Sequence, residues 1–347
     1  MVPPSVPPSA LPASARLTVG VALGLVASLA FGVSGTFARP LLEAGWTPGA
    51  TVFWRIVAAS ALLAPVGLWV MRGRLSAVLS EWKLIVGFGV LGVAAAQLMY
   101  FAAVARISVS VALLLEYLAP VALVLVAWAR SRRTPSRLIL GGTALSLLGL
   151  VGVLDLTGAQ LDPLGVMFGL LAMIGAAGYF VLSARPSSLH PLALPAFGLP
   201  VGAVVLGAAI LTGAVPYATP LVDVELLGTA VPWWVPLAVI VVFATAMSYS
   251  LGVAGIGMMG ERLGSFVSLS EVLFAAVIAA LVLGEVPSAI QAAGGLAIVA
   301  GVVLIRLDNG RPAVRTGPRP GRPDGPARTR GPAVPSTRTG AGRRSSR

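Results

Sequence analysis

Two glutamates lie inside long apolar stretches of the chain, where a charged side chain is rarely found. Glu116 stands in LLLEYLAPV, residues 113–121, within a run that is otherwise largely apolar over 109–128. Glu271 stands in the similar stretch FVSLSEVLFAA. A carboxylate at membrane depth is costly and usually faces a polar interior, where it serves in proton relays or solute pathways. We therefore predict that both glutamates bind protons or a polar solute.

Residues near Glu116 in the sequence or at the same depth could complete such a site. Pro120 has no N–H, so the carbonyl of Glu116 loses its helical partner and we expect a kink beside the acid. Arg55, in VFWRIVAAS, is predicted to lie at the depth of Glu116. Its guanidinium could pair with that carboxylate or hold a carboxylate of the substrate. The remaining candidates for the same cavity are Gln97, Tyr100 and Tyr117.

Each of these residues also has a purely structural explanation. A protonated glutamate can make one hydrogen bond between helices, and a proline can be tolerated for helix packing alone. Arg55 could extend along the apolar surface to the lipid headgroups. An interior tyrosine or glutamine is commonly a packing residue with one hydrogen bond. Ala275 stands where the second half would match Pro120, so the kink is not expected to be symmetric.

The composition requires membrane-spanning helices to hold these residues. The chain has 347 residues, of which 57% are hydrophobic and 10% are charged, and its mean hydropathy is +0.94. A helix needs about 20 mainly apolar residues to cross the hydrocarbon core. Ten segments meet this need: 17–38, 48–71, 84–104, 109–129, 138–154, 163–184, 192–214, 233–254, 264–283 and 288–306. We predict an all-α integral membrane protein with ten transmembrane helices.

The basic residues indicate how these helices are oriented. If the spans alternate, one side receives eleven Arg and Lys residues and the other receives only Arg39 and Arg106. The positive-inside rule then places both termini in the cytoplasm. Residues 1–16 and the Arg/Pro-rich 307–347 have few large apolar side chains, and we expect both to be disordered. The tail carries most of the net charge of +12, so that charge does not predict a nucleic-acid partner.

Matching segments indicate an internal duplication. GVALGLVA at 20–27 resembles GVMFGLLA at 165–172, and VALLLEYLAPV at 111–121 aligns with FVSLSEVLFAA at 266–276. The offset between matching segments stays between 145 and 155 residues, and the alignment pairs the two glutamates.

The duplication predicts two repeats, residues 17–154 and 163–306. Each repeat has five spans, an odd number, so the second must be inserted upside down relative to the first. Inverted repeats with a site near the bilayer midplane are an architecture of secondary transporters.

The residue inventory excludes several other classes of site. There is no cysteine and only one histidine, His190, which excludes disulfides, thiol chemistry and a His/Cys metal site. The sequence has no nucleotide-binding loop, so we do not expect ATP to drive it directly. It also has no clustered catalytic constellation. We expect no cofactor, no metal and no enzymatic activity.

The stretch YFAAVARISVSVALLLEYLAPVALVL, followed by a short basic loop, Pro135 and a glycine-bearing span, resembles the drug/metabolite transporter superfamily, EamA type. ERLGSFVSLSEVLFAAVIAALVLGE resembles the same signature and ends in the family's usual Gly-Glu, here Gly284-Glu285. The resemblance covers residues 17–306 and implies a ten-helix exporter of small metabolites. Leu-Glu-Tyr-Leu-Ala-Pro resembles the threonine/homoserine exporter branch, although Phe31-Gly32 replaces the Trp-Gly of many members.

Together these observations predict a secondary active transporter of a bacterial inner (plasma) membrane. It would export a small polar metabolite, such as an amino acid, by proton antiport with alternating access. The expected partners are the substrate, protons and the lipid bilayer, and we expect no nucleic-acid partner. A homodimer is compatible with the sequence. One alternative is a proton-independent facilitator or an importer of the same fold. A second alternative, which has less support, is an intramembrane enzyme.

Overall fold

The computed structural model of the chain describes residues 12–107, 109–132, 134–154, 162–283 and 288–309. Within these ranges nine helices are long and apolar enough to cross a membrane, and a shorter apolar helix covers 137–153. Helices occupy all ten predicted spans, which confirms the predicted all-α membrane fold. Helix already covers 13–16 and continues over 307–309, contrary to the predicted disorder of those short stretches. The rest of the two terminal segments, and Gly284-Glu285, lie outside the described residues.

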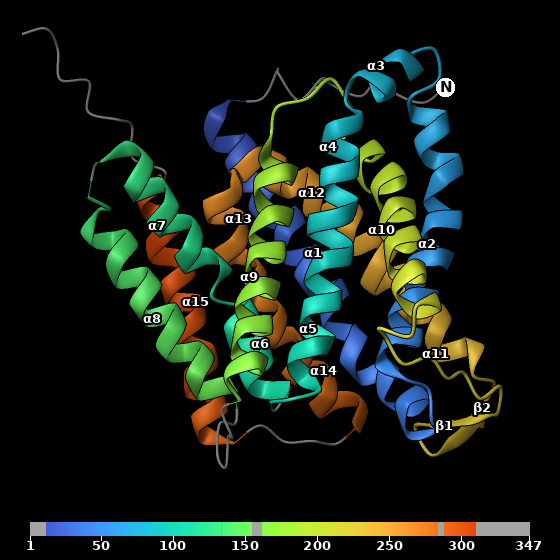
Figure 1. The fold of residues 1–347 in the computed structure, drawn as a ribbon. Helices are drawn as coiled ribbons and strands as arrows, with labels where there is room; N and C mark the ends of the chain where they lie inside the picture. Colours follow the sequence, from blue (N-terminus) through green and yellow to red (C-terminus); the bar gives the residue numbers. More distant parts are fainter. Residues whose placement is uncertain (1–11, 108, 133, 155–161, 284–287, 310–347) are drawn as a thin grey trace, which may run out of the picture. The chain divides into compact units, whose positions relative to one another are not determined.

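The first half of the protein contains four of the long helical segments and the shorter apolar helix (Figure 1). Its elements are α1 Ala13–Glu43, α2 Pro48–Val70, α3 Leu75–Ser80, α4 Trp82–Gly87, η2 Phe88–Ala95, α5 Ala96–Val104, α6 Val109–Glu116, α7 Ala119–Ser131 and α8 Arg137–Val153. The third span runs through α4, the π-helix η2 and α5 without a break. The fourth span is divided into α6 and α7.

The second half repeats this plan. Its elements are α9 Pro163–Ala184, α10 Ala193–Leu211, β1 Val224–Leu226, β2 Thr229–Val231, α11 Trp234–Val239, η3 Ile240–Met247, α12 Ser248–Met259, α13 Glu261–Ser268, α14 Ser270–Leu283 and α15 Ala289–Asn309. The eighth span contains the π-helix η3, and the ninth is divided into α13 and α14. Both irregularities therefore occur in corresponding helices of the two halves.

The hairpin of β1 and β2 differs from the sequence prediction, which had only a loop between the seventh and eighth spans. Its strands are antiparallel, and it lies at the end of the helices opposite to α3 (Figure 1). The turn residues Leu227 and Gly228 have φ values of 54° and 72°, and positive φ at both positions suits a two-residue hairpin turn. Leucine rarely adopts positive φ, so its residue type gave no signal for this turn.

Several helices begin at caps that the sequence supplies. The Ser136 hydroxyl accepts a hydrogen bond from the N–H of Ile139 at the start of α8. Asp162 caps α9 by accepting from the N–H groups of Leu164 and Gly165 at 2.7 and 3.0 Å. These N–H groups, that of Gly165 above all, hold the pKa of Asp162 below its usual value, and the nearby charge of Arg106 adds to the effect.

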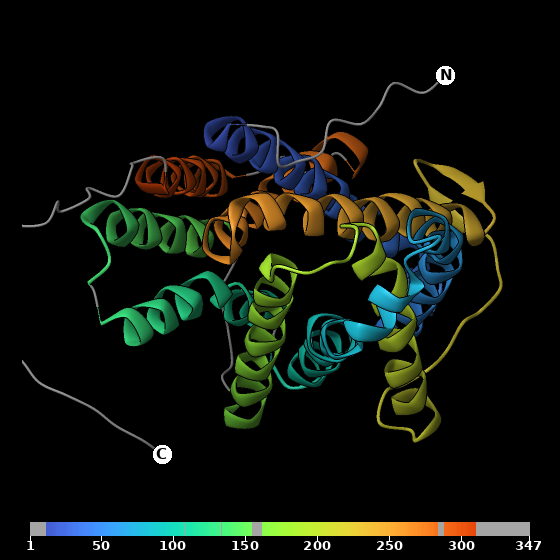
Figure 2. The same ribbon diagram turned by 90° about the horizontal axis from the view of Figure 1, so that it is seen from above.

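The two halves are intertwined and do not pack as separate bundles. The π-helix η2 of the first half packs against α9 and α10, the first two helices of the second half. In the same way η3 packs against α1 and α2. The last helices of the two halves, α8 and α15, lie side by side (Figures 1 and 2). Each half therefore depends on the other for its packing.

Glycine allows the close approach of α8 and α15. A Cβ atom added to Gly142 would lie 2.7 Å from the carbonyl oxygen of Gly301, and the reverse distance is 2.6 Å. Small residues at such crossings are the usual means by which membrane helices pack backbone against backbone. Gly141, one residue earlier, has no atom within 4 Å of such a Cβ.

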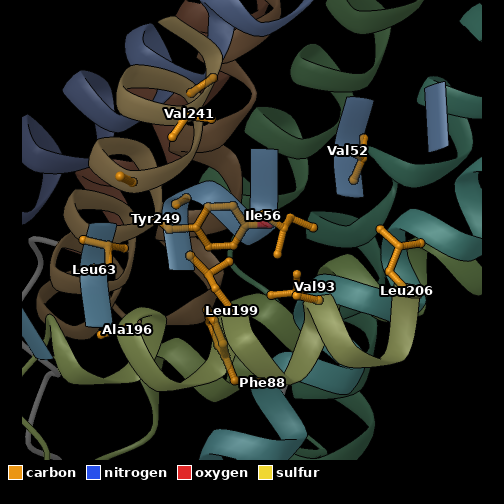
Figure 3. Packing of buried hydrophobic residues seen from close by; sticks show 14 of the residues in the cluster. Val52, Ile56, Leu63, Phe88, Val93, Ala196, Leu199, Leu206, Val241 and Tyr249 are labelled. Atoms are coloured by element: carbon orange, nitrogen blue, oxygen red, sulfur yellow. The ribbon is translucent and has the colours of Figure 1, made fainter. Parts of the chain in front are cut away.

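The largest cluster of buried apolar side chains in the described residues lies between α2, α10, η2 and α12. Phe88 of η2 and Leu199 of α10 meet Ile56 of α2 and Tyr249 of α12 there (Figure 3). The Phe88 and Tyr249 rings contact edge to face with centroids 6.3 Å apart. This cluster joins helices of both halves beside the cavity described next.

Candidate functional site

A cavity of about 650 Å³ lies among helices from both halves. All seven residues that the sequence proposed as a site line it: Arg55, Gln97, Tyr100, Glu116, Tyr117, Pro120 and Glu271. They come from α2, α5, α6, α7, α14 and the α6–α7 break. The structure thus brings together side chains from spans that are far apart in the sequence.

The cavity is more accessible from the hairpin end of the helices than from the other end. Gly35, Leu42 and Pro48 line it near the hairpin end and are exposed, Leu42 by 39%. Gly24 and Ile256 line it toward the opposite end and are buried. At that end α1 packs closely against α12, where a Cβ atom added to Gly255 would lie 2.9 Å from the carbonyl oxygen of Gly20.

Glu116 is the last residue of α6, directly before a two-residue break at Tyr117 and Leu118. Pro120 lies in the first turn of α7, where its missing N–H is tolerated. Regular α-helix is interrupted at these two residues, but the N–H of Tyr117 still bonds to the carbonyl of Leu113 and that of Leu118 to the carbonyl of Leu115. In the described part of the chain the Glu116 side chain makes no hydrogen bond or ion pair with another residue, so its carboxyl group is available to a ligand.

Glu271 is the second residue of α14 and also stands at a helix break, which falls at Leu269. No proline produces this break, because Ala275 occupies the position that matches the proline of the first half. Instead the hydroxyls of Ser268 and Ser270 each donate to the carbonyl three residues earlier, at 2.7 Å. Such back-bonding offers the backbone an alternative to regular helix. Both spans are thus interrupted beside a glutamate, but the interruption follows Glu116 in the fourth span and precedes Glu271 in the ninth.

Tyr117 joins the two halves at these breaks. Its hydroxyl donates a hydrogen bond to Oε1 of Glu271 over 3.1 Å. Because Tyr117 directly follows Glu116, this bond draws the break in the fourth span toward the break in the ninth. Both glutamates line the cavity, and Tyr117 connects the two segments that carry them.

Arg55 is buried, with 5% of its surface exposed, and its environment differs from the one predicted. Nη1 donates to Oγ of Ser34 at 2.9 Å, and the guanidinium carbon lies 5.4 Å from the centroid of the Phe31 ring. Among the described residues no carboxylate lies within 4.0 Å of Arg55, so the predicted ion pair with Glu116 is not formed. The hydrogen bond to Ser34 holds the guanidinium against α1 instead. Burial also contradicts an extension to the headgroups.

Gln97 and Tyr100 lie three residues apart on α5, one turn of helix, and both line the cavity half-buried. No hydrogen bond connects either side chain to another residue in the ranges that the structure describes. Their polar groups thus remain free to contact a ligand.

The lining also includes residues that were not predicted, among them Phe31, Ser34, Tyr179 and Tyr249. The ring of Tyr249 lies 6.4 Å from that of Phe31 and 5.7 Å from that of Tyr179, centroid to centroid. The duplication could have identified Tyr249, which follows the predicted Gln97 by 152 residues, a spacing within the repeat offset. Tyr179 follows Ser34 by 145 residues, but Ser34 was not itself predicted, so the duplication gave no signal for Tyr179.

Comparison with known proteins gives a family match and a fold match. The chain matches the EamA-like transporter family over residues 18–155 and again over 163–307. A solved crystal structure of a protein with 20% sequence identity has a TM-score of 0.67, and the match covers 84% of this chain and 99% of that one. At this identity the likeness concerns the fold alone. A search of curated proteins finds no match.

Proposed function

Because the chain belongs to the EamA-like transporter family, a family of membrane transporters and not of enzymes, we propose that it exports a small polar metabolite in exchange for protons. An amino acid is the solute class that we propose. The site would lie in the cavity between the two EamA domains, and the cavity would open alternately to each side of the membrane. We place the protein in a bacterial plasma membrane with both termini in the cytoplasm, since the basic residues favour that orientation.

One observation carries this proposal: Glu116 and Glu271, one from each half, line the same cavity and each stands next to a helix break. Broken helices near the bilayer midplane are where secondary transporters bind substrates and coupling ions. A carboxylate in such a cavity can hold a proton or a cationic group of the solute, but not both at once. Competition between the two would couple proton entry to solute exit.

The other candidate residues take supporting roles in this proposal. Tyr117 would position Glu271 through its hydrogen bond, and Pro120 would keep the fourth span broken beside Glu116. Gln97 and Tyr100 would offer polar contacts to the solute. The hairpin end, which is the accessible end of the cavity, would face the cell exterior in the proposed orientation.

Reconstituted liposomes can test the proposal with threonine and homoserine first, because Leu-Glu-Tyr-Leu-Ala-Pro resembles the exporter branch for these solutes, followed by other amino acids. We expect an imposed pH gradient to drive accumulation of at least one amino acid. Glu116→Gln should abolish the accumulation, because the amide that replaces the carboxylate can neither take up a proton nor pair with a cationic group of the solute. Glu225→Gln, at an exposed residue of β1, is the matched control and should behave as the unaltered protein.

Two outcomes of the same assay would lead to another function. Amino-acid flux that is indifferent to the pH gradient would indicate a facilitator of the same fold. Accumulation in which the solute and protons move in the same direction would indicate an importer. Either result would contradict the proposed antiport.

A further inference from the structure

The geometry points to a substrate class for this cavity: α-amino acids whose side chain is large and apolar. The carboxylate of the ligand would lie at Arg55, its ammonium group at Glu116, and its side chain along the rings that begin at Phe31. This inference rests on the proposed function, since it concerns the same cavity, and it names the kind of amino acid that would be carried.

Arg55 supplies the first part of the argument. An arginine keeps its charge when buried, and a buried charge normally has a partner of opposite sign. Within the described residues Arg55 has one hydrogen bond, to Ser34, and its Nε has no partner. No carboxylate of the protein lies within 4.0 Å of it among these residues. A carboxylate of the ligand would supply the missing negative charge and accept from the guanidinium fork.

Glu116 supplies the negative charge that would pair with the ammonium group of the ligand. It lines the same cavity as Arg55 and makes no hydrogen bond or ion pair within the described ranges. Glu271, by contrast, already accepts a hydrogen bond from Tyr117. Glu116 is thus the carboxylate that is free to receive an ammonium group. A ligand with both charges would pair its carboxylate with Arg55 and its ammonium group with Glu116.

The aromatic wall determines which side chain fits. Phe31 touches Arg55 on one side and Tyr249 on the other. From Tyr249 the rings continue to Tyr179 and then to Phe180, whose centroids are 5.2 Å apart. An amino acid held at Arg55 would therefore lay its side chain along this apolar wall. Each methylene that it buries there would tighten binding about fourfold.

The size of the cavity agrees with a large side chain. Its volume of about 650 Å³ falls within the range of roughly 300–1,000 Å³ that is usual for small-molecule sites. A small hydroxylated side chain such as that of threonine would leave most of the aromatic wall without contact. We therefore expect selectivity against the small solutes of the exporter branch that the sequence resembles.

The test measures binding of tritiated L-phenylalanine and L-leucine to the purified full-length protein in liposomes at one fixed pH. Unlabelled competitors are L-threonine, phenethylamine, which lacks the carboxylate, and 3-phenylpropionate, which lacks the ammonium group. We expect each competitor to bind at least tenfold more weakly than phenylalanine. Threonine binding as tightly as phenylalanine, or phenethylamine competing as well as phenylalanine, would overturn the inference.

Two variants then test which residue binds the carboxylate of the ligand and which binds its ammonium group. Arg55→Gln should weaken phenylalanine binding about tenfold to a hundredfold, as expected for loss of a charge-assisted hydrogen bond, and leave phenethylamine competition unchanged. Glu116→Gln should weaken phenylalanine binding but spare 3-phenylpropionate. Arg72→Gln, at an exposed arginine, is the control and should leave all affinities unchanged. An equal loss for all ligands in Arg55→Gln would mean a structural role and contradict the assignment.

The failure of this inference can be told apart from failure of the proposed function. Proton-driven accumulation of threonine without any preference for phenylalanine would contradict the substrate class and leave antiport intact. No accumulation of any amino acid would contradict both.

Discussion

The hydroxyl of Tyr117 lies 3.1 Å from Oε1 of Glu271, and this hydrogen bond links the broken fourth helix to the broken ninth. The two residues come from opposite halves of the duplicated chain, at the point where both helices are interrupted. The same two spans also pack against each other through α7 and α13, so this hydrogen bond adds a polar link to an apolar contact between the halves. Interactions of this kind are what an inverted-repeat transporter needs between its moving halves.

Tyr117→Phe removes the hydroxyl and keeps the ring. We expect proton-driven flux to fall severalfold and its pH profile to change, because Glu271 loses its donor. The loss of stability should be modest, about 0.6 kcal/mol, which is the average for hydrogen bonds between membrane helices. Flux at several pH values and thermal unfolding measure the two effects. Tyr217→Phe, outside the cavity lining, is the control, and equal pH profiles for Tyr117→Phe and the unaltered protein would contradict the role.

Gly142→Ala should destabilise the contact of α8 with α15. The added Cβ would lie 2.7 Å from the carbonyl oxygen of Gly301, and such overpacking typically costs about 1–3 kcal/mol. Gly141→Ala is a matched control one residue away, where the Cβ meets no atom within 4 Å. It should leave the protein equally stable or stabilise it by up to about 1 kcal/mol through helix propensity. Thermal unfolding in detergent measures both variants. Equal melting temperatures for Gly142→Ala and Gly141→Ala would contradict the close packing of α8 against α15.

The sequence identified the spans and the polar residues of the cavity for one reason: burial in lipid is costly for charge. Glu116 and Glu271 could not face the acyl chains cheaply, so their placement in an interior cavity followed from their type and depth. The duplication paired them and could also have indicated Tyr249, which matches Gln97. These inferences used only hydropathy, spacing and the cost of burial.

Other features depend on geometry that residue types do not encode. The partner of Arg55 is decided by which side chain its rotamer reaches, and Ser34 on α1 is nearer than Glu116. The break at Leu269 has no proline to announce it and arises among serines whose hydroxyls bond to nearby carbonyls. The Leu227 turn is held in a conformation that its residue type disfavours. Prediction failed where tertiary contacts outweigh local preference.

Pro120→Ala should reconnect α6 and α7. Alanine restores an N–H that can bond to the carbonyl of Glu116, so the break should shorten or close. We expect proton-driven flux to fall, because a continuous helix would move the carboxyl group of Glu116 relative to the cavity, while thermal stability stays the same or rises. Pro65→Ala, at an exposed proline inside α2, tests whether any helix proline matters and should leave flux unchanged. Normal flux through Pro120→Ala would show that the break is dispensable.

Asp162 gives a pH-dependent contribution to stability outside the membrane spans. The N–H groups at the start of α9 lower its pKa, with help from Arg106, whose Nη1 lies 3.5 Å from Oδ2. A carboxyl group with a lowered pKa in the folded protein stabilises the fold above its unfolded pKa, and this contribution is lost as pH falls through the folded value. Asp162→Asn keeps the cap but removes the charge. We expect the melting temperature of Asp162→Asn to lie below that of the unaltered protein near pH 7 and to converge with it in strongly acidic buffer. The control Asp223→Asn, at an exposed loop residue, should melt at the same temperature as the unaltered protein at both pH values. A constant gap from neutral to acidic pH would mean that the charge at Asp162 contributes nothing to the start of α9.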